Sequence, residues 1–271
     1  MLTWMEEIFG VKKPIIAMCH LQPLPGDPYY DKEAGMKKVL EAAKKDLDAL
    51  QTGGVDGVMF SNEFSLPYLT KVETVTVAAM ANVIGELKKE LSIPHGVNCL
   101  WDPVASLDLA VAVDAKFIRE IISGVYASDF GLWNTNVGAT VRHKMAIGAE
   151  NVKMLYNIVP EAAMYLADRN IADIARSTEF NNHPDALCVS GLTAGSETDT
   201  QILSVVKNAV KKTPVLCNTG CNKDNIVKQL SVADGAVCAT TFKYDGVFEN
   251  GVDVQRVKEF MDTVKEFRKT L

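Results

Sequence analysis

Short runs of apolar and β-branched residues recur along the chain, each followed by a polar or glycine-containing turn and, in most cases, a longer segment with helical spacing. Eight such runs are found, at residues 14–20, 57–61, 96–101, 117–121, 152–159, 186–190, 214–220 and 236–242. Helical spacing is found at residues 36–50, 72–91, 140–147, 200–211, 223–230 and 254–268. This alternation predicts parallel strands joined by crossover helices.

Eight strand–helix units are the number that closes a parallel sheet into a (β/α)₈ TIM barrel. The run at residues 14–19 is apolar on both parities, as expected where helices cover one face of a strand and the barrel core fills the other. No Pro/Ser-rich linker or low-complexity tract divides the chain, so we expect residues 1–271 to form a single domain. A short N-terminal helix carries Trp4, Met5, Ile8 and Phe9 on one side and is expected to close the bottom of the barrel.

The charge balance indicates which partners to expect, and the cysteines indicate the cellular compartment. Basic residues number 28 and acidic residues 34, and the net charge of −6 argues against a general nucleic-acid or anionic-membrane surface. The first ten residues lack the basic start of a secretory signal, and no apolar run approaches the roughly 20 residues that span a bilayer. Most of the six cysteines lie in apolar runs, which is typical of reduced thiols. We therefore expect a cytoplasmic protein without nucleic acid or membrane insertion.

Polar residues at the carboxyl ends of the strands are the functional candidates, because active sites of these barrels lie there. Arg119 and Glu120 are adjacent on one strand, so they point to opposite faces and one charge must enter the barrel. An arginine at the mouth of the barrel binds a carboxylate or phosphate through two hydrogen bonds, and a glutamate there acts as a base. The alternative is that the charged residue only forms a structural ion pair. His20 is a candidate acid or base, or the residue that orients a neighbour. The predicted catalytic residues are His20, Asp102, Arg119 and Glu120.

Further polar residues at these ends and in the loops beyond them are expected to contact the substrate. Asparagines on the second, third and fifth strands form a ring of amides suited to a hydroxylated substrate or an enolate-like intermediate. The alternative is that they only form hydrogen bonds with other polar groups at the mouth of the barrel. Asp129 lies in a predicted loop at residues 123–138, and Lys243 lies beyond the last strand, where it would close over a ligand. The predicted substrate-binding residues are Asn62, Glu63, Asn98, Asp129, Asn157 and Lys243.

The ends of the last three strands are typical of an anion site. Residues 190–195 and 218–222 are small-residue turns that let backbone N–H groups approach a ligand, and the second leads into a helix capped by Asn222. Phosphate sites of barrel enzymes use the loops after strands seven and eight. The alternative is that these glycines only make tight turns. The predicted phosphate-binding residues are Ser190, Gly191, Thr219, Gly220, Thr240 and Thr241.

The sequence assigns no cofactor and no metal ligand. Neither turn is a nucleotide-loop signature, and no CxxC pair occurs. A divalent metal held by Glu63, Asp102 and Glu120 stays open, although no ligand spacing requires it. Barrels with apolar helical faces often self-associate, so we expect a homo-oligomer.

Several motifs resemble one known family across nearly the whole chain. KPIIAMCHLQPLPGDP at residues 13–28, GVN at 96–98 and DALCVSG at 185–191 resemble the BtpA/SgcQ family. SNEFSLPYLTK at 61–71 and FKYDGVF at 242–248 resemble its SgcQ-like branch. The resemblance implies a TIM barrel of the phosphate-binding type. One branch is associated with photosystem I biogenesis and the other with sugar phosphotransferase transport genes; NIVPE at 157–161 departs from the photosystem-type pattern.

We therefore expect an enzyme that acts on a small phosphorylated carbohydrate or related metabolite at the mouth of the barrel. The expected reaction is isomerisation, epimerisation or aldolase-type cleavage. Two alternatives stay open. One is a non-catalytic assembly or stability factor of the BtpA type, and the other is a metal-dependent hydrolase or lyase.

Overall fold

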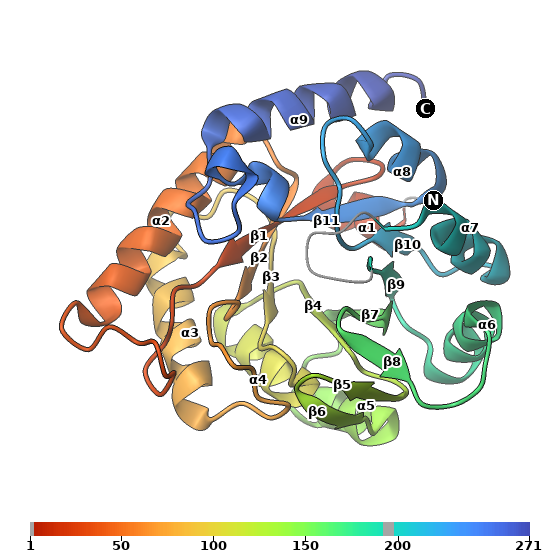
Figure 1. Ribbon diagram of the computed structural model, residues 1–271, viewed down its shortest axis with the longest axis horizontal. Helices are drawn as coiled ribbons and strands as arrows, with labels where there is room; N and C mark the ends of the chain where they lie inside the picture. Colours follow the sequence, from red (N-terminus) through yellow and green to blue (C-terminus); the bar gives the residue numbers. More distant parts are fainter. Residues whose placement is uncertain (1–2, 192–197) are drawn as a thin grey trace.

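The core of the molecule is a closed barrel of eight parallel strands (Figure 1). The structure is a computed structural model that describes residues 3–191 and 198–271. Neighbouring strands in the barrel follow the order β1, β11, β10, β9, β7, β4, β3 and β2, which returns to β1. Their bounds are β1 (Ile15–His20), β2 (Gly57–Ser61), β3 (His95–Asn98), β4 (Phe117–Glu120), β7 (Lys153–Val159), β9 (Ala186–Val189), β10 (Val215–Cys217) and β11 (Gly235–Cys238). The predicted (β/α)₈ barrel is confirmed.

Helices surround the barrel and cover its outer face (Figure 1). They are α2 (Gly35–Gly53), α3 (Thr74–Leu87), α4 (Pro103–Val113), α5 (Val137–Ala146), α6 (Ile171–Asn182), α7 (Thr200–Ala209), α8 (Ile226–Val232) and α9 (Val254–Arg268). The sequence pattern did not single out α4 or α6. Apolar residues occur all around α4, so no helical period stands out there. No helix among the described residues is long and apolar enough to cross a membrane.

The N-terminal helix closes the bottom of the barrel, as predicted. Helix α1 (Trp4–Phe9) places Met5 and Phe9 in a buried cluster with the inward side chains of β1 and β4. The Phe9 and Phe117 rings lie 5.6 Å apart. A side chain at Gly57 would lie 2.6 Å from the Phe9 ring, so the close approach of α1 to β2 requires glycine there.

The predicted loop at residues 123–138 is wrong, because two of its segments are strands. A small antiparallel sheet has the order β6 (Gly131–Asn134), β5 (Val125–Ser128) and β8 (Ala163–Tyr165). Its inner face buries Tyr126 and Trp133. The alternation is only four residues long on β5 and β6 and three on β8, and the pairing with β8 joins segments far apart in the chain. This sheet lies beside the mouth of the barrel, where Trp133 packs on Trp101.

Three predicted strands end earlier than expected, and this changes where the polar residues lie. Strands β3, β10 and β11 stop at Asn98, Cys217 and Cys238. The pair Thr219–Gly220 therefore lies in a turn, and Thr240–Thr241 begins a short 3₁₀ helix, η1 (Thr240–Phe242), followed by η2 (Tyr244–Gly246). Asparagine 225, rather than Asn222, precedes α8.

Glu179 on α6 ties that helix to the segment that leads into β10. Its carboxylate accepts backbone hydrogen bonds of 2.9–3.1 Å from residues 211–213. Partial burial raises the pKa of Glu179, but these hydrogen bonds outweigh it and lower the pKa from 4.5 to about 2. The ionised carboxylate therefore stabilises the fold, and that contribution is lost as the pH falls from about 4.5 toward about 2.

We expect Glu179→Gln to lower the free energy of unfolding by about 1 kcal/mol at neutral pH, because charge-assisted hydrogen bonds are replaced by neutral ones. The difference from the unmodified protein should shrink at about pH 3. Urea unfolding at both pH values measures it. Glu266→Gln, which removes an exposed ion pair with Lys269, is the control and should change stability little. An equal loss in both variants would contradict this role for Glu179.

Candidate functional site

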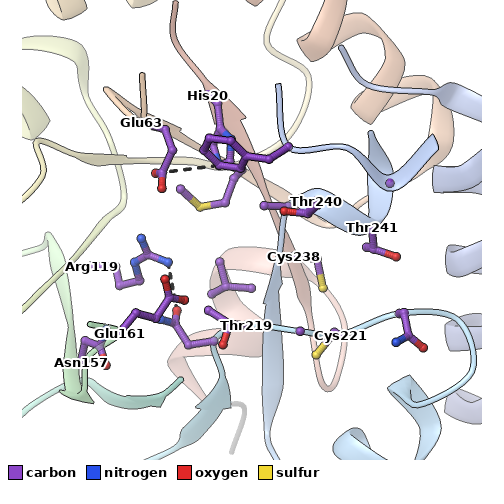
Figure 2. Close-up of a pocket in the computed structure, with 18 of the residues that line it drawn as sticks. His20, Glu63, Arg119, Asn157, Glu161, Thr219, Cys221, Cys238, Thr240 and Thr241 are labelled. Atoms are coloured by element: carbon purple, nitrogen blue, oxygen red, sulfur yellow. Dashed lines mark hydrogen bonds and ion pairs between the residues drawn. The ribbon is translucent and has the colours of Figure 1, made fainter. Parts of the chain in front are cut away.

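A cavity of about 270 Å³ opens at the carboxyl-terminal mouth of the barrel (Figure 2). Side chains from the ends of β1, β2, β4, β7, β10 and β11 and from the loops beyond them line it. The structure brings together half of the residues predicted from the sequence. Those that line the cavity are His20, Glu63, Arg119, Asn157, Thr219, Gly220, Thr240 and Thr241.

Arg119 is the strand-four charge that enters the barrel. Its Nη1 donates to Asn218 Oδ1 at 3.0 Å, and its Nη2 donates to Asn98 Oδ1 at 2.7 Å. Both hydrogen-bonding partners are neutral amides, so the guanidinium is held in place while its positive charge remains available to a ligand. Asn98 itself does not line the cavity, and it acts on the site through Arg119.

Glu120 points the opposite way, toward α4, and lies outside the cavity lining. Its Oε1 accepts hydrogen bonds from the Asn98 amide and, at 3.1 Å, from the Ser106 hydroxyl. Burial raises the pKa of Glu120 well above its usual value, and the nearby Arg119 charge only partly opposes this. In this position Glu120 orients Asn98, and burial favours its neutral form. The catalytic role expected from the sequence stays a prediction.

Asp102 and Asn62 stabilise loops at the mouth instead of lining the cavity. Asp102 is the N-cap of α4, and its Oδ1 accepts from the Val104 and Ala105 amides at 3.1 Å. Asn62 Oδ1 accepts from the Leu100 amide at 2.8 Å. Both side chains are buried polar groups whose partners are backbone N–H groups.

Asp129 and Lys243 lie away from the cavity. Asp129 is exposed in the turn between β5 and β6. Lys243 is almost completely buried, and its Nζ forms an ion pair with Asp46 Oδ2 at 3.0 Å. This pair connects the segment after β11 to α2, so Lys243 anchors that segment, and its predicted contact with a ligand stays a prediction.

The carboxylates named in the metal alternative do not converge. Glu63 faces the cavity, Asp102 caps α4 and Glu120 contacts Ser106. Across residues 3–191 and 198–271, no group of three or more His, Cys, Asp or Glu side chains is arranged to hold a metal ion.

One side of the cavity carries two acids and a histidine beside Arg119 (Figure 2). His20 Nε2 lies 3.9 Å from Glu63 Oε2. Burial lowers the pKa of His20 well below its usual value, and the charges of Lys243 and Arg119 add to this, so the imidazole is neutral. Burial raises the pKa of Glu63, while Arg119 and a 3.0 Å hydrogen bond from Ser61 oppose the increase.

Glu161 is the main residue that the sequence analysis did not select. It follows β7 and lines the cavity near Arg119 and Asn157 (Figure 2). Burial and the negative charge of Glu63 raise the pKa of Glu161 to about 7, while Arg119 acts in the opposite direction. The sequence signal that could have identified Glu161 is an acidic residue just beyond the end of a predicted strand. Strand β7 is irregular between Asn157 and Val159, and this irregularity hid the position of Glu161.

The other side of the cavity is rich in hydroxyl groups and backbone. Thr219 and Gly220 form the turn after β10, with Gly220 at a φ of +68°, and Thr240 and Thr241 begin η1. Arg256, which the sequence analysis also missed, reaches this side from α9, and its Nε donates to the Thr241 carbonyl at 2.9 Å. These residues provide hydrogen-bond donors and include no carboxylate, so this side of the cavity suits an anionic group.

Ser190 and Gly191 support this arrangement from behind the lining. Ser190 Oγ accepts from the Asn218 amide at 2.8 Å and from the Asn157 amide at 3.3 Å. The Gly191 amide donates to Thr219 Oγ1 at 2.6 Å. The remainder of the predicted 190–195 turn, from residue 192, lies outside the described residues.

We expect Glu120→Gln to leave the free energy of unfolding within about 1 kcal/mol of the unmodified protein, because an amide replaces a neutral acid and keeps the acceptor for Asn98 and Ser106. Glu120→Ala should lose about 3 kcal/mol, because it leaves a void and unpaired buried donors. Urea unfolding of both variants measures this. A large loss in Glu120→Gln would show that Glu120 is ionised.

The fold and the cavity define a TIM-barrel protein with a polar site at the carboxyl ends of its strands. Two solved structures share the fold, with low sequence identity. A thiamine phosphate pyrophosphorylase from Pyrococcus furiosus is 17% identical, with a TM-score of 0.56, over 94% of this chain and 96% of that chain. An N-acetylmannosamine-6-phosphate 2-epimerase from Clostridium perfringens is 16% identical, with a TM-score of 0.54, over 96% and 94%.

Within this class, the chain belongs to the BtpA family, whose family model matches residues 11–266. It is 62% identical over 268 residues to the putative sgc region protein SgcQ of Escherichia coli strain K12, covering 99% of this chain and 100% of that protein. It is 30% identical over 263 residues to the photosystem I biogenesis protein BtpA of Synechocystis, covering 96% and 91%.

Proposed function

We propose that the protein is an isomerase or epimerase of a small sugar phosphate that moves a proton at a carbon next to a carbonyl group. The observation that carries this proposal is the two-sided cavity. Hydroxyl and backbone groups suited to a phosphate lie on one side, and Glu161 lies beside Arg119 on the other. The alternative within the same site is aldolase-type cleavage, which uses the same enolate chemistry.

The phosphate is held at the Thr219–Gly220 turn and at the start of η1. Thr240, Thr241 and Arg256 bring two hydroxyls and a guanidinium to this side of the cavity. The Arg256 guanidinium is fixed by its hydrogen bond to the Thr241 carbonyl. The two solved structures with phosphorylated compounds in their names support the proposal only through the shared fold.

Glu161 is the general base and Arg119 stabilises the charge that develops. A base with a pKa of about 7 is half ionised near neutral pH and can both accept a proton and return it. As the proton leaves carbon, negative charge moves to the carbonyl oxygen, and the fixed Arg119 guanidinium binds that oxygen. The neutral His20 donates a hydrogen bond to a substrate oxygen from its place beside Glu63.

We expect inorganic phosphate and sugar phosphates to raise the melting temperature, and unphosphorylated sugars to leave it unchanged, since a ligand that binds only the folded state stabilises it. Arg256→Gln should weaken phosphate binding about tenfold, the order expected for one charge-assisted contact. Thermal shift and calorimetry measure both. Arg142→Gln, on the exposed face of α5, is the matched control. Equal responses to phosphorylated and unphosphorylated sugars would remove the phosphate site from the proposal.

We expect the protein to exchange a carbon-bound proton of its substrate with solvent deuterium, and Glu161→Gln to slow this exchange at least about 100-fold, as for loss of a general base. The rate should rise with pH through about 7, because the ionised form of Glu161 is the base. NMR of a sugar-phosphate panel in D₂O measures the exchange. Glu150→Gln, exposed before β7, is the matched control. Exchange that persists in Glu161→Gln would assign the base elsewhere.

A second candidate function is a non-catalytic factor, the role that the name of the Synechocystis relative suggests. The observation that favours it is the outer face of the β6–β5–β8 sheet, where Leu132 is 57% exposed and Met164 is 75% exposed in one row with Ala127. A protein of this kind tolerates substitutions at Arg119 and Glu161 without loss of its role. The absence of exchange with every sugar phosphate tested would favour this candidate.

A further inference from the structure

We infer that Cys217 and Cys221 form an oxidisable dithiol in the wall of the cavity, a modification site for small hydroperoxides. All six cysteines of the chain are buried thiols. Cys217 Sγ and Cys221 Sγ lie 3.3 Å apart, and both side chains are buried, at 0% and 4% exposure. The two sulfur atoms are therefore close enough to react with each other, which a single buried thiol is not.

The two sulfur atoms are close enough to bond after a small movement. A disulfide has an S–S distance of about 2.05 Å, so closure needs a movement of about 1.3 Å. Cys217 is the last residue of β10, and Cys221 lies four residues further on, across the turn that contains Gly220. The positive φ of Gly220, +68°, folds this turn back and brings the sulfurs together.

The cavity gives a small oxidant a route to one of the two thiols. Cys221 and Cys238 line the cavity (Figure 2). Cys217 is not among the lining residues. The contact with Cys221 and burial raise the pKa of the Cys217 thiol. Cys221 is therefore the thiol that meets the oxidant first, and the protonated Cys217 reacts second.

The reaction balances with one hydroperoxide per dithiol. The Cys221 sulfur attacks the O–O bond of the hydroperoxide, becomes a sulfenic acid and releases an alcohol, or water when the oxidant is hydrogen peroxide. The Cys217 sulfur then attacks Cys221 Sγ, its proton leaves with the hydroxyl group as water, and the S–S bond forms. Two electrons pass from the two thiols to the peroxide oxygens.

Closure changes the residues between the two sulfurs, and this consequence rests on the proposed function. Asn218 holds Arg119, and Thr219 accepts a hydrogen bond from the Gly191 amide. The Cys217 thiol also donates to the Thr219 carbonyl at 3.7 Å, and the disulfide removes this donor. A tighter turn therefore displaces both the arginine and the hydroxyl side of the cavity, and we expect phosphate to bind about tenfold more weakly.

Treating the reduced full-length protein with hydrogen peroxide tests the dithiol. The expected result is a loss of two thiols from the six, a mass lower by two hydrogens, and a peptide that links Cys217 to Cys221. Dithiothreitol should restore all of the thiols. Cys221→Ser and Cys221→Ala should each lose this product, and thermal melting verifies that they fold. Cys238→Ser, a change in the same cavity wall, should keep it.

Unchanged thiol content, a mass that only gains oxygen, or a link that involves Cys238 would overturn the inference. Phosphate binding to the reduced and oxidised forms separates it from the proposed function. If the reduced protein does not respond to phosphate, the proposed phosphate site fails while the disulfide still stands on its mass. If the disulfide forms and phosphate binds equally to both forms, the inferred effect on the cavity is overturned.

Discussion

The site depends on a guanidinium buried inside the barrel. Removing a charge from water is costly unless its donors are paired, and Arg119 meets this constraint with two amide oxygens, those of Asn98 and Asn218. Each amide must be kept from rotating, because its N–H₂ group would face the arginine in the wrong orientation. Glu120 accepts from Asn98, and Ser190 accepts from Asn218, so both amides are fixed from behind.

The charge of Arg119 also sets the acid–base properties of the cavity. Burial raises the pKa of Glu63 and of Glu161, and the nearby arginine limits the increase in both. A fixed positive charge beside a glutamate that titrates near neutrality gives this side of the cavity a proton acceptor and a binding point for an oxyanion. The opposite side has hydroxyl groups and Arg256, so the two ends differ in chemistry. This division is the basis of the proposed reaction.

The sequence predicted the barrel because its signals are local. Apolar runs and helical spacing mark β1 and α9 within one or two residues. The sequence did not predict elements whose local signals are weak: α4 is apolar on all sides, and the strands of the β6–β5–β8 sheet are short. At the site, the sequence correctly indicated that one charge of the Arg119–Glu120 pair enters the barrel. It did not indicate which one, because that depends on the stagger of β4 relative to β3 and β7.

By itself the sequence determined the fold class, the family and the edge of the barrel at which polar residues gather, because strand periodicity and motifs are properties of neighbouring residues. Only the tertiary structure decided which of those residues share the cavity. Asp102 caps the start of a helix, and Lys243 pairs with an aspartate 197 residues away. Glu161 lines the cavity just after a strand whose pairing is irregular. These outcomes depend on contacts between distant segments, which form only when the barrel closes.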